Sequence, residues 1–282
     1  MIMNIVINKQ FDEERALYNL RDAKVLNCIF AGAADGESVL KETRNIIVEN
    51  CSFSLRYPLW HADKFSLLNS KLDELTRAPI WYCTNGEINN TQILSVKALR
   101  ECKGIIVKDS VITSAEFGWK CENISVDNCD ITSEYIFFDS KDIKINNLKF
   151  NGKYSFQYIE NLTIENSVLD TKDAFWHSKN VTVKNSIVKG EYLAWFSENL
   201  TLINCKITGT QPFCYCKNLK LENCEMFDTD LSFEYSDVQA DIKGSILSVK
   251  NPRSGYIKAD SIDKIINEDS VMETLCEIKV NS

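Results

Sequence analysis

Glycine, proline and histidine are scarce in this chain of 282 residues, which has 10 glycines, 4 prolines and 2 histidines. No linker rich in these residues divides the sequence, so we expect one domain over residues 1–282. No apolar run approaches the roughly eighteen residues of a membrane span. Residues 1–18 include three consecutive acids, Asp12 to Glu14, and lack the apolar core of a signal peptide. These features predict a cytoplasmic protein that does not enter a membrane.

Basic residues are outnumbered, with 32 lysines and arginines against 40 acids, a net charge of −8 and a pI near 5.0. Nucleic acid is therefore not expected as a partner, because phosphate binding needs a basic face. The 11 cysteines, with no export signal, indicate reduced thiols. Most fall at small, inward positions of the repeat described below, which favours core packing over zinc. We expect no metal and no cofactor.

A repeat of 19 residues organises the chain. Closely similar heptads begin at Asn161, Asn180 and Asn199, and the register extends from Asp22 to Asn218 with two short insertions. We number the first heptad residue position 0. Positions 1 and 3 are apolar and positions 2 and 4 are mostly polar, which is typical of a short half-buried strand. One such strand cannot satisfy its own hydrogen bonds, so the strands must stack on one another.

The repeat therefore predicts an all-β fold, a single-stranded parallel β-helix of about 12 coils. A left-handed β-helix uses strict hexapeptides, which this chain lacks, so we expect a right-handed one. We assign residues 1–21 to an N-terminal cap and first partial coil. Residues 22–236 form the regular coils, and residues 237–282 form an irregular coil and C-terminal cap.

Position 5 holds asparagine in almost every coil. Asparagine tolerates the left-handed backbone of a sharp corner, and its amide can bond the equivalent amide of the next coil. The pattern predicts an asparagine ladder along one corner. Its members are Asn27, Asn50, Asn69, Asn90, Asp109, Asn128, Asn147, Asn166, Asn185, Asn204 and Asn223.

Several segments outside this template carry a family resemblance. They are Glu14–Tyr18, Gly36–Glu42, Tyr57–Trp60, Ile80–Tyr82, Asp173–Trp176 and Asn251–Gly255. With them the chain resembles the pectin-lyase-like right-handed β-helix superfamily, and more narrowly a bacterial domain family of unknown function. The resemblance implies the fold over nearly the whole chain and implies no activity.

All 5 tryptophans fall at position 15 of their coils. Positions 14 and 17 are apolar or small and are expected inside. Position 15 also holds Lys41 and Arg100, which favours an outward column because unpaired charges are rarely buried. Position 16 carries both histidines among acids and aromatic rings. Rings beside polar groups suit a sugar, whose C–H face packs on an aromatic ring. The candidate ligand-binding residues are Trp60, Trp81, Arg100, Trp119, Lys120, Phe138, Tyr158, Trp176 and Trp195.

These columns support a binding scaffold for a glycan or another extended ligand, and three alternatives stay open. The tryptophans could instead point inward and fill a wide core. The same column could join copies of the chain in a homo-oligomer. A carbohydrate-active hydrolase or lyase could use Glu101 and Asp139, two coils and roughly 10 Å apart, or His177. The chain lacks the catalytic motifs of pectin hydrolases and lyases, so the sequence leans away from an enzyme.

Overall fold

The computed structural model describes residues 3–281, and these are almost entirely strands and turns. The one helix there is a short 3₁₀ helix, η1 (Glu74–Thr76). No helix of the described residues is long and apolar enough to cross a membrane. The chain divides into two compact units, residues 1–144 and 145–282, and each is described by itself.

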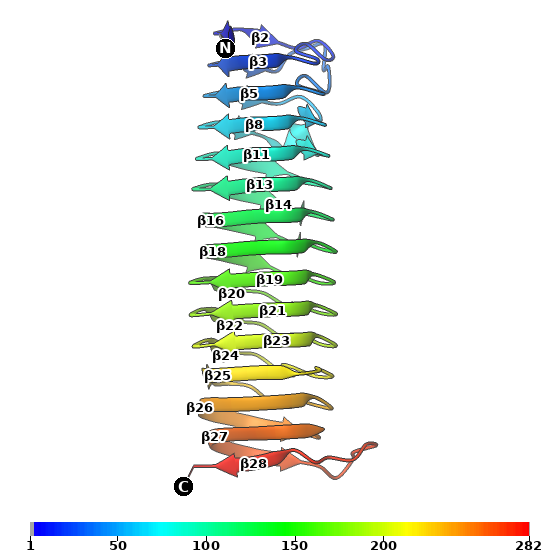
Figure 1. Cartoon of the computed structure of the whole chain (residues 1–282), viewed down its shortest axis with the longest axis vertical. Helices are drawn as coiled ribbons and strands as arrows, with labels where there is room; N and C mark the ends of the chain where they lie inside the picture. The colour runs from blue at the N-terminus through cyan, green and yellow to red at the C-terminus, as the bar shows by residue number, and fades with distance from the viewer. Residues whose placement is uncertain (1–2, 282) are drawn as a thin grey trace. The chain divides into compact units, whose positions relative to one another are not determined.

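In the first unit, one strand per coil pairs in parallel with its counterpart in the next coil (Figure 1). Ala23 lies opposite Ile46, and Ile46 lies opposite Phe65, so the apolar positions of successive coils coincide. These strands are β3 (Arg21–Leu26), β5 (Arg44–Glu49), β8 (Asp63–Leu68), β11 (Thr84–Asn89), β13 (Lys103–Lys108) and β16 (Glu122–Ser133).

A second, shorter strand follows each corner of the first unit and also pairs in parallel. These are β4 (Ile29–Phe30), β6 (Ser52–Phe53), β9 (Lys71–Leu72), β12 (Gln92–Ser95) and β14 (Val111–Ser114). Two-residue strands close the coils and form the pairs β7 (Leu59–Trp60) with β10 (Ile80–Trp81) and β15 (Glu116–Phe117) with β17 (Tyr135–Ile136). β18 (Lys141–Gly152) carries the chain into the second unit.

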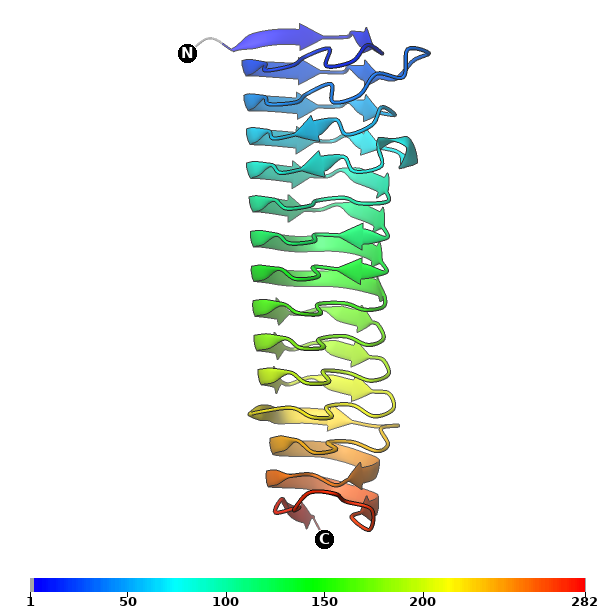
Figure 2. The ribbon, with the colours of Figure 1, turned by 90° about the vertical axis from the view of Figure 1, so that its right-hand side faces the viewer.

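The second unit repeats this pattern, as Figure 2 shows from the side. Its long strands are β19 (Glu160–Glu165), β21 (Lys179–Lys184), β23 (Glu198–Ile203), β25 (Leu219–Met226), β26 (Asp237–Lys250), β27 (Ser254–Ile266) and β28 (Glu277–Val280). Its short strands are β20 (Val168–Asp170), β22 (Ile187–Lys189) and β24 (Lys206–Thr208).

The fold is a right-handed parallel β-helix, and the predicted fold class is confirmed. Coils also extend past the predicted regular region. β1 (Asn4–Ile7) and β2 (Gln10–Phe11) pair with β3 and β4, inside the segment expected to be an N-terminal cap and first partial coil. At the other end, β26 to β28 continue the parallel pairing, with shifts of register in β26. The heptad template misses these coils because their residues depart from it while their backbones still pair.

Left-handed residues make the corners of each coil. Every position-5 residue has a positive φ, and so does every position-0 residue from Asp22 to Asn218. Amide groups link both rows within each unit. At position 5, Asn90 Nδ2 donates to Asn69 Oδ1 at 2.7 Å. At position 0, Asn218 Nδ2 donates to Asn199 Oδ1 at 2.8 Å. The second row was not predicted, although its residues are mostly Asn and Asp.

Many of the small residues at positions 6 and 17 form hydrogen bonds between neighbouring coils. The Ser110 Oγ accepts the buried N–H of Thr91 at 3.1 Å and donates to the Lys108 carbonyl at 2.6 Å. Cysteine takes the same place elsewhere: the N–H of Cys102 donates to the Cys121 Sγ at 3.4 Å. A hydroxyl or thiol is needed because it can both donate and accept a hydrogen bond. Most of the cysteines are therefore structural.

Candidate ligand-binding surface

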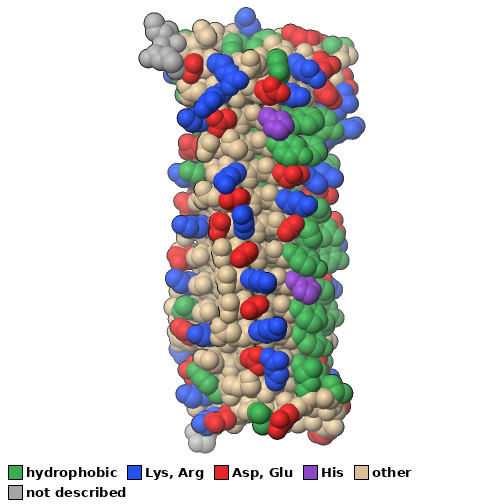
Figure 3. All heavy atoms as spheres, turned by 45° about the vertical axis from the view of Figure 1, so that its right-hand side comes forward, with side chains coloured by type: hydrophobic (Ala, Val, Ile, Leu, Met, Phe, Trp, Pro, Cys, Tyr) green, Lys and Arg blue, Asp and Glu red, His purple; other side chains and the backbone are tan. Residues whose placement is uncertain are grey.

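The aromatic columns at positions 15 and 16 lie on one side of each coil. In many coils, residues with positive φ alternate there with residues of negative φ. In the coil around Phe175, positions 12, 14 and 16 all have positive φ. Position 14 is buried in almost every coil, and position 17 is buried. Position 16 is largely exposed, and all five tryptophans of position 15 are half-buried. Figure 3 shows the resulting apolar areas and the two histidines among charged side chains.

The first unit holds a continuous stack at position 15. Trp60 and Trp81 lie face to face, with ring centroids 5.5 Å apart and planes 12° apart. The Lys41 ammonium lies 5.0 Å from the Trp60 ring centroid. The Arg100 guanidinium lies 5.6 Å from the Trp81 centroid and 5.3 Å from that of Trp119. Cations and rings therefore cover one another's faces.

Arg100 is held in this stack by acids as well as by rings. Its Nη1 donates to the Glu116 carboxylate at 3.0 Å, and its Nε lies 3.8 Å from the Glu101 carboxylate. Beyond Arg100, Trp119 contacts Phe138 at 4.9 Å between centroids. The predicted residues Trp60, Trp81, Arg100, Trp119 and Phe138 are thus brought together in one column of the first unit.

Position 16 of the first unit adds polar groups beside this stack. His61 stacks on Tyr82 with centroids 4.9 Å apart, and His61 is exposed. Lys120 and Asp139 are also exposed, and Glu101 is half-buried. Along this edge of the unit, the rings of His61 and Tyr82 are thus followed by three charged side chains.

Tyrosines at position 12 are functional candidates that the sequence reasoning missed. Tyr57 contacts Trp60 edge to face, with planes 70° apart, and Trp119 contacts Tyr135 with planes 77° apart. Both tyrosines are half-buried. Because the tryptophans stack coil on coil, a ring turned this far has its plane along the stacking direction. The ring faces of Tyr57 are therefore turned away from the coils above and below. Tyrosine recurs at position 12 in four coils, at Tyr57, Tyr135, Tyr154 and Tyr192, and this recurrence could have identified them.

In the second unit the exposed rings belong mainly to position 16. His177 stacks between Tyr158, at 5.0 Å, and Phe196, at 5.1 Å, and Phe196 stacks on Tyr215 at 4.7 Å. Tyr158 is 50% exposed and Phe196 is 46% exposed. Burial, with the neighbouring Glu234 carboxylate, raises the pKa of the Tyr215 phenol.

Position 15 of the second unit is less open. Trp176 and Trp195 stack at 5.4 Å with planes 7° apart, and Tyr192 meets Trp195 edge to face at 81°. Gln157, Cys214 and Phe233, in the same column, are buried. The expectation that position 15 faces outward is therefore wrong at these three residues and half met at the tryptophans. Left-handed residues flank Gln157 and Cys214 at positions 14 and 16, and Phe233 is itself left-handed, which ends the in-and-out alternation of a strand.

We call the two areas the first aromatic patch (Tyr57, Trp60, His61, Trp81, Tyr82, Arg100, Trp119, Tyr135, Phe138) and the second aromatic patch (Tyr158, Trp176, His177, Tyr192, Trp195, Phe196, Tyr215). In both, the tryptophans offer ring edges to a ligand, because neighbouring rings cover their faces. Ring edges carry partial positive charge and suit oxygen atoms. In the first patch, the ring of Tyr57 is turned across the stack, with its plane 70° from that of Trp60.

The carboxylates proposed for catalysis remain separate side chains of one column. Glu101 and Asp139 lie two coils apart with Lys120 between them in sequence register. Glu101 is paired with Arg100, as described above. His177, the third candidate, belongs to the second unit and is engaged in ring stacking on both faces. In the described part of the chain, no three His, Cys, Asp or Glu side chains gather as a metal site would require.

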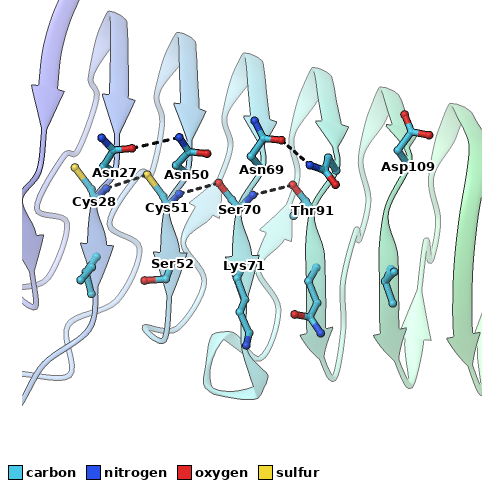
Figure 4. Close-up of a pocket in the computed structure, with 14 residues that line it drawn as sticks. Asn27, Cys28, Asn50, Cys51, Ser52, Asn69, Ser70, Lys71, Thr91 and Asp109 are labelled. Atoms are coloured by element: carbon cyan, nitrogen blue, oxygen red, sulfur yellow. Dashed lines mark hydrogen bonds between the residues drawn. The ribbon is translucent and has the colours of Figure 1, made fainter.

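A shallow groove of about 730 Å³ follows the asparagine corner of the first unit (Figure 4). Its rim is the position-5 row, and its floor includes Cys51, Ser70 and Thr91. The N–H of Cys51 donates to the Ser70 Oγ at 3.0 Å, so the floor is tied together between coils. The rim amides also bond to one another. The polar groups that line the groove therefore already bond to one another and serve the structure of the corner.

Fold and surface together define a parallel β-helix protein that carries two aromatic patches. Within that class, the chain belongs to the DUF3737 family, described as protein of unknown function, whose model matches residues 4–279. No curated protein matches the sequence.

Solved structures of similar fold were also found. The chain is similar to a tailspike protein of E. coli bacteriophage HK620 in complex with a hexasaccharide, with 9% identity and a TM-score of 0.50. The match covers 98% of this chain and 65% of the tailspike chain, less than two thirds of it. It supports the fold alone.

Two weaker matches carry no further argument. A catalytic domain of GH87 α-1,3-glucanase in complex with nigerose has 8% identity and a TM-score of 0.34, over 99% of this chain and 63% of that one. The periplasmic alginate epimerase AlgG has 9% identity and a TM-score of 0.28, over 92% and 77%.

Proposed function

We propose that this protein is a binding scaffold for an extended carbohydrate, which lies along the first aromatic patch. The observation that carries the proposal is Tyr57, whose ring is turned across the tryptophan stack of that patch. Its ring face suits the C–H face of a pyranose. The neighbouring tryptophan edges and the charged groups of position 16 suit its hydroxyls.

The charges of the first patch favour a sugar over a protein partner. His61, Lys120 and Asp139 lie exposed beside the rings. The core of a protein interface is depleted in charge, because burying an unpaired charge is costly. Sugar hydroxyls can instead donate to the carboxylates and accept from the ammonium groups while water stays nearby.

The repeat also suits a polymer better than a small ligand. Successive coils are about 4.8 Å apart, so equivalent groups recur at that spacing along the stack. A chain of sugars that runs along the coils meets the same kind of contact again at each step. The tailspike structure cited above holds a hexasaccharide. At 9% identity it contributes the fold to this argument and not a site.

Free thiols extend the proposal to a location. The cysteines of the described residues form no disulfide. Free thiols persist in a reducing compartment, so we place this protein in the cytoplasm. Cell fractionation with a periplasmic and a cytoplasmic marker tests this, and recovery with the periplasmic marker contradicts it.

A glycan array followed by calorimetric titration of the best binder tests the function. We expect Tyr57→Ala to weaken binding about three- to tenfold, the effect of losing one aromatic contact. Phe227→Ala is the matched control, because Phe227 is an exposed ring, 43% accessible, outside both patches. An array without hits, or equal losses in the control, rejects a carbohydrate scaffold.

Light scattering separates this function from self-association. A monomer that binds oligosaccharide agrees with the proposal. A dimer that Tyr57→Ala dissociates, with no binding on the array, identifies the first patch as an interface between copies. Turnover of a bound oligosaccharide that Asp139→Asn abolishes identifies a hydrolase or lyase.

A further inference from the structure

The tryptophans of the two patches differ in one respect: the partner of the indole N–H. In the second patch, Trp176 Nε1 donates to the Tyr192 carbonyl at 2.6 Å, and Trp195 Nε1 donates to the Gln211 carbonyl at 2.9 Å. Gln157 follows the same rule, because its Nε2 donates to the Asp173 carbonyl at 2.8 Å. Each donor is at position 15, and each acceptor is the position-12 carbonyl of the next coil.

In the first patch, the indole N–H groups of Trp60, Trp81 and Trp119 are buried and have no hydrogen-bond partner. A buried donor without an acceptor destabilises the folded state, because it has lost its hydrogen bonds to water. Three such donors in one column of one unit form a pattern that packing alone does not explain.

The backbone of the acceptor residue accounts for the difference. Asp173, Tyr192 and Gln211 all have positive φ, between 48° and 54°. Tyr135, the corresponding residue one coil after Trp119, lies in β17 and is not among the left-handed residues. Its ring, not its carbonyl, meets the Trp119 edge. Ala78 and Lys97, the position-12 residues one coil after Trp60 and Trp81, are not left-handed either. The three tryptophans of the first patch therefore lack the left-handed acceptor residue that the second unit supplies.

A half turn about the Cβ–Cγ bond moves an indole N–H from one edge of the ring to the other and leaves the ring plane unchanged. The turned ring therefore stays parallel to its neighbours in the stack. At Trp176 or Trp195 the turn breaks a hydrogen bond and leaves a carbonyl without its donor. At Trp60, Trp81 and Trp119 it breaks none. All five rings are half-buried, so each has an edge toward solvent.

We propose that Trp60, Trp81 and Trp119 turn their indole N–H outward and donate it to oxygen atoms of the ligand, while Trp176 and Trp195 are fixed structural residues. This inference rests on the proposed function and locates it in the first patch. The ligand class is a chain with acceptor oxygens at the coil spacing, such as the hydroxyl and ring oxygens of a polysaccharide. A purely apolar ligand does not use these donors.

Indole N–H exchange with water, measured by ¹H–¹⁵N NMR on the whole chain without ligand, tests the turning directly. We expect the signals of Trp60, Trp81 and Trp119 to exchange about tenfold faster than those of Trp176 and Trp195, the factor expected from one hydrogen bond. Equal protection of all five signals overturns the inference.

Titration with cellohexaose and chitohexaose tests the role in binding. Phenylalanine keeps an aromatic ring and removes the N–H, so Trp119→Phe is paired with Trp176→Phe as the matched control. We expect Trp119→Phe to weaken binding about threefold to tenfold and Trp176→Phe to leave it unchanged. If binding occurs and the two variants do not differ, the inference fails and the proposed function stands. If no oligosaccharide binds the unaltered protein, the proposed function fails, and the exchange rates still decide whether the indoles turn.

Discussion

Removing one hydroxyl inside the stack should cost far more than its size indicates. Ser110 is 2% exposed, and its Oγ accepts the N–H of Thr91 at 3.1 Å and donates to the Lys108 carbonyl at 2.6 Å. Ser110→Ala leaves the Thr91 N–H buried without an acceptor, because Thr91 is itself 2% exposed. A buried donor left unpaired costs about 1–3 kcal/mol, and the lost bond to the carbonyl adds about 1 kcal/mol. We expect the free energy of unfolding to fall by about 2–4 kcal/mol.

Urea unfolding, followed by circular dichroism, measures this loss, and hydrogen exchange locates it. Exchange at the Thr91 amide should accelerate more than at amides of distant coils. Ser110→Thr is the control, because the same column holds Thr91 and a threonine hydroxyl can make both bonds. A Ser110→Ala protein within about 0.5 kcal/mol of the original, the range of an ordinary surface substitution, would show that the inward hydroxyls are only spacers.

Three further substitutions test the same physical account. Burial raises the pKa of the Asp173 carboxyl above its ordinary 3.8. The folded state therefore favours the protonated acid. The stabilisation that this acid gives the folded state is complete below 3.8 and is lost as the pH rises through the raised folded-state pKa. Asp173→Asn should therefore raise the melting temperature at neutral pH and not at low pH, and an unchanged neutral value contradicts this. The hydrogen bond from Arg253 lowers the pKa of the Asp237 carboxyl. The stabilisation that this bond gives the folded state is complete above the ordinary pKa and is lost as the pH falls through the lowered folded-state pKa. Asp237→Asn should flatten the acid limb of the stability curve, measured by thermal melts between neutral and strongly acidic pH. At the corner, Asn204 has a φ of +52° and accepts a hydrogen bond from Asn223. Asn204→Ala should lower the free energy of unfolding by about 2 kcal/mol, and Asn204→Gly should lower it less, because glycine adopts this conformation freely. Equal losses for the two variants in urea unfolding would refute the role of the backbone.

The fold could be predicted because it depends on features that recur with a fixed period. The alternation at positions 1 to 4 decides which side of each strand is buried, and Val25 and Val48 show how adjacent coils bring the same position together. Asparagine at position 5 indicates a left-handed corner whichever coil it is in. The coils of residues 4–11 and 237–280 were not predicted as regular coils, because backbone pairing there does not depend on the heptad.

The candidate site was predicted in part, since the sequence identified the aromatic columns and not their geometry. Beyond position 12, side chains no longer alternate between the inside and the outside of the coil, because several residues there are left-handed, such as Phe175 and His177. Two residues of the same column can then differ in burial, as half-buried Trp195 and buried Cys214 do. The repeat shows tyrosine recurring at position 12, and only the structure shows that the Tyr57 ring lies across the tryptophan stack.

The sequence by itself determined the repeat, the corners and the inward columns, because these follow from the chemistry of each residue at its place in the coil. Only the tertiary structure decided that the tryptophans cover one another's faces and that three of their N–H groups lack a partner. Those properties arise between coils. A ring's neighbour is a residue about 19 positions away, and its acceptor depends on whether that coil's backbone is left-handed or extended. The composition of a single coil does not contain that information.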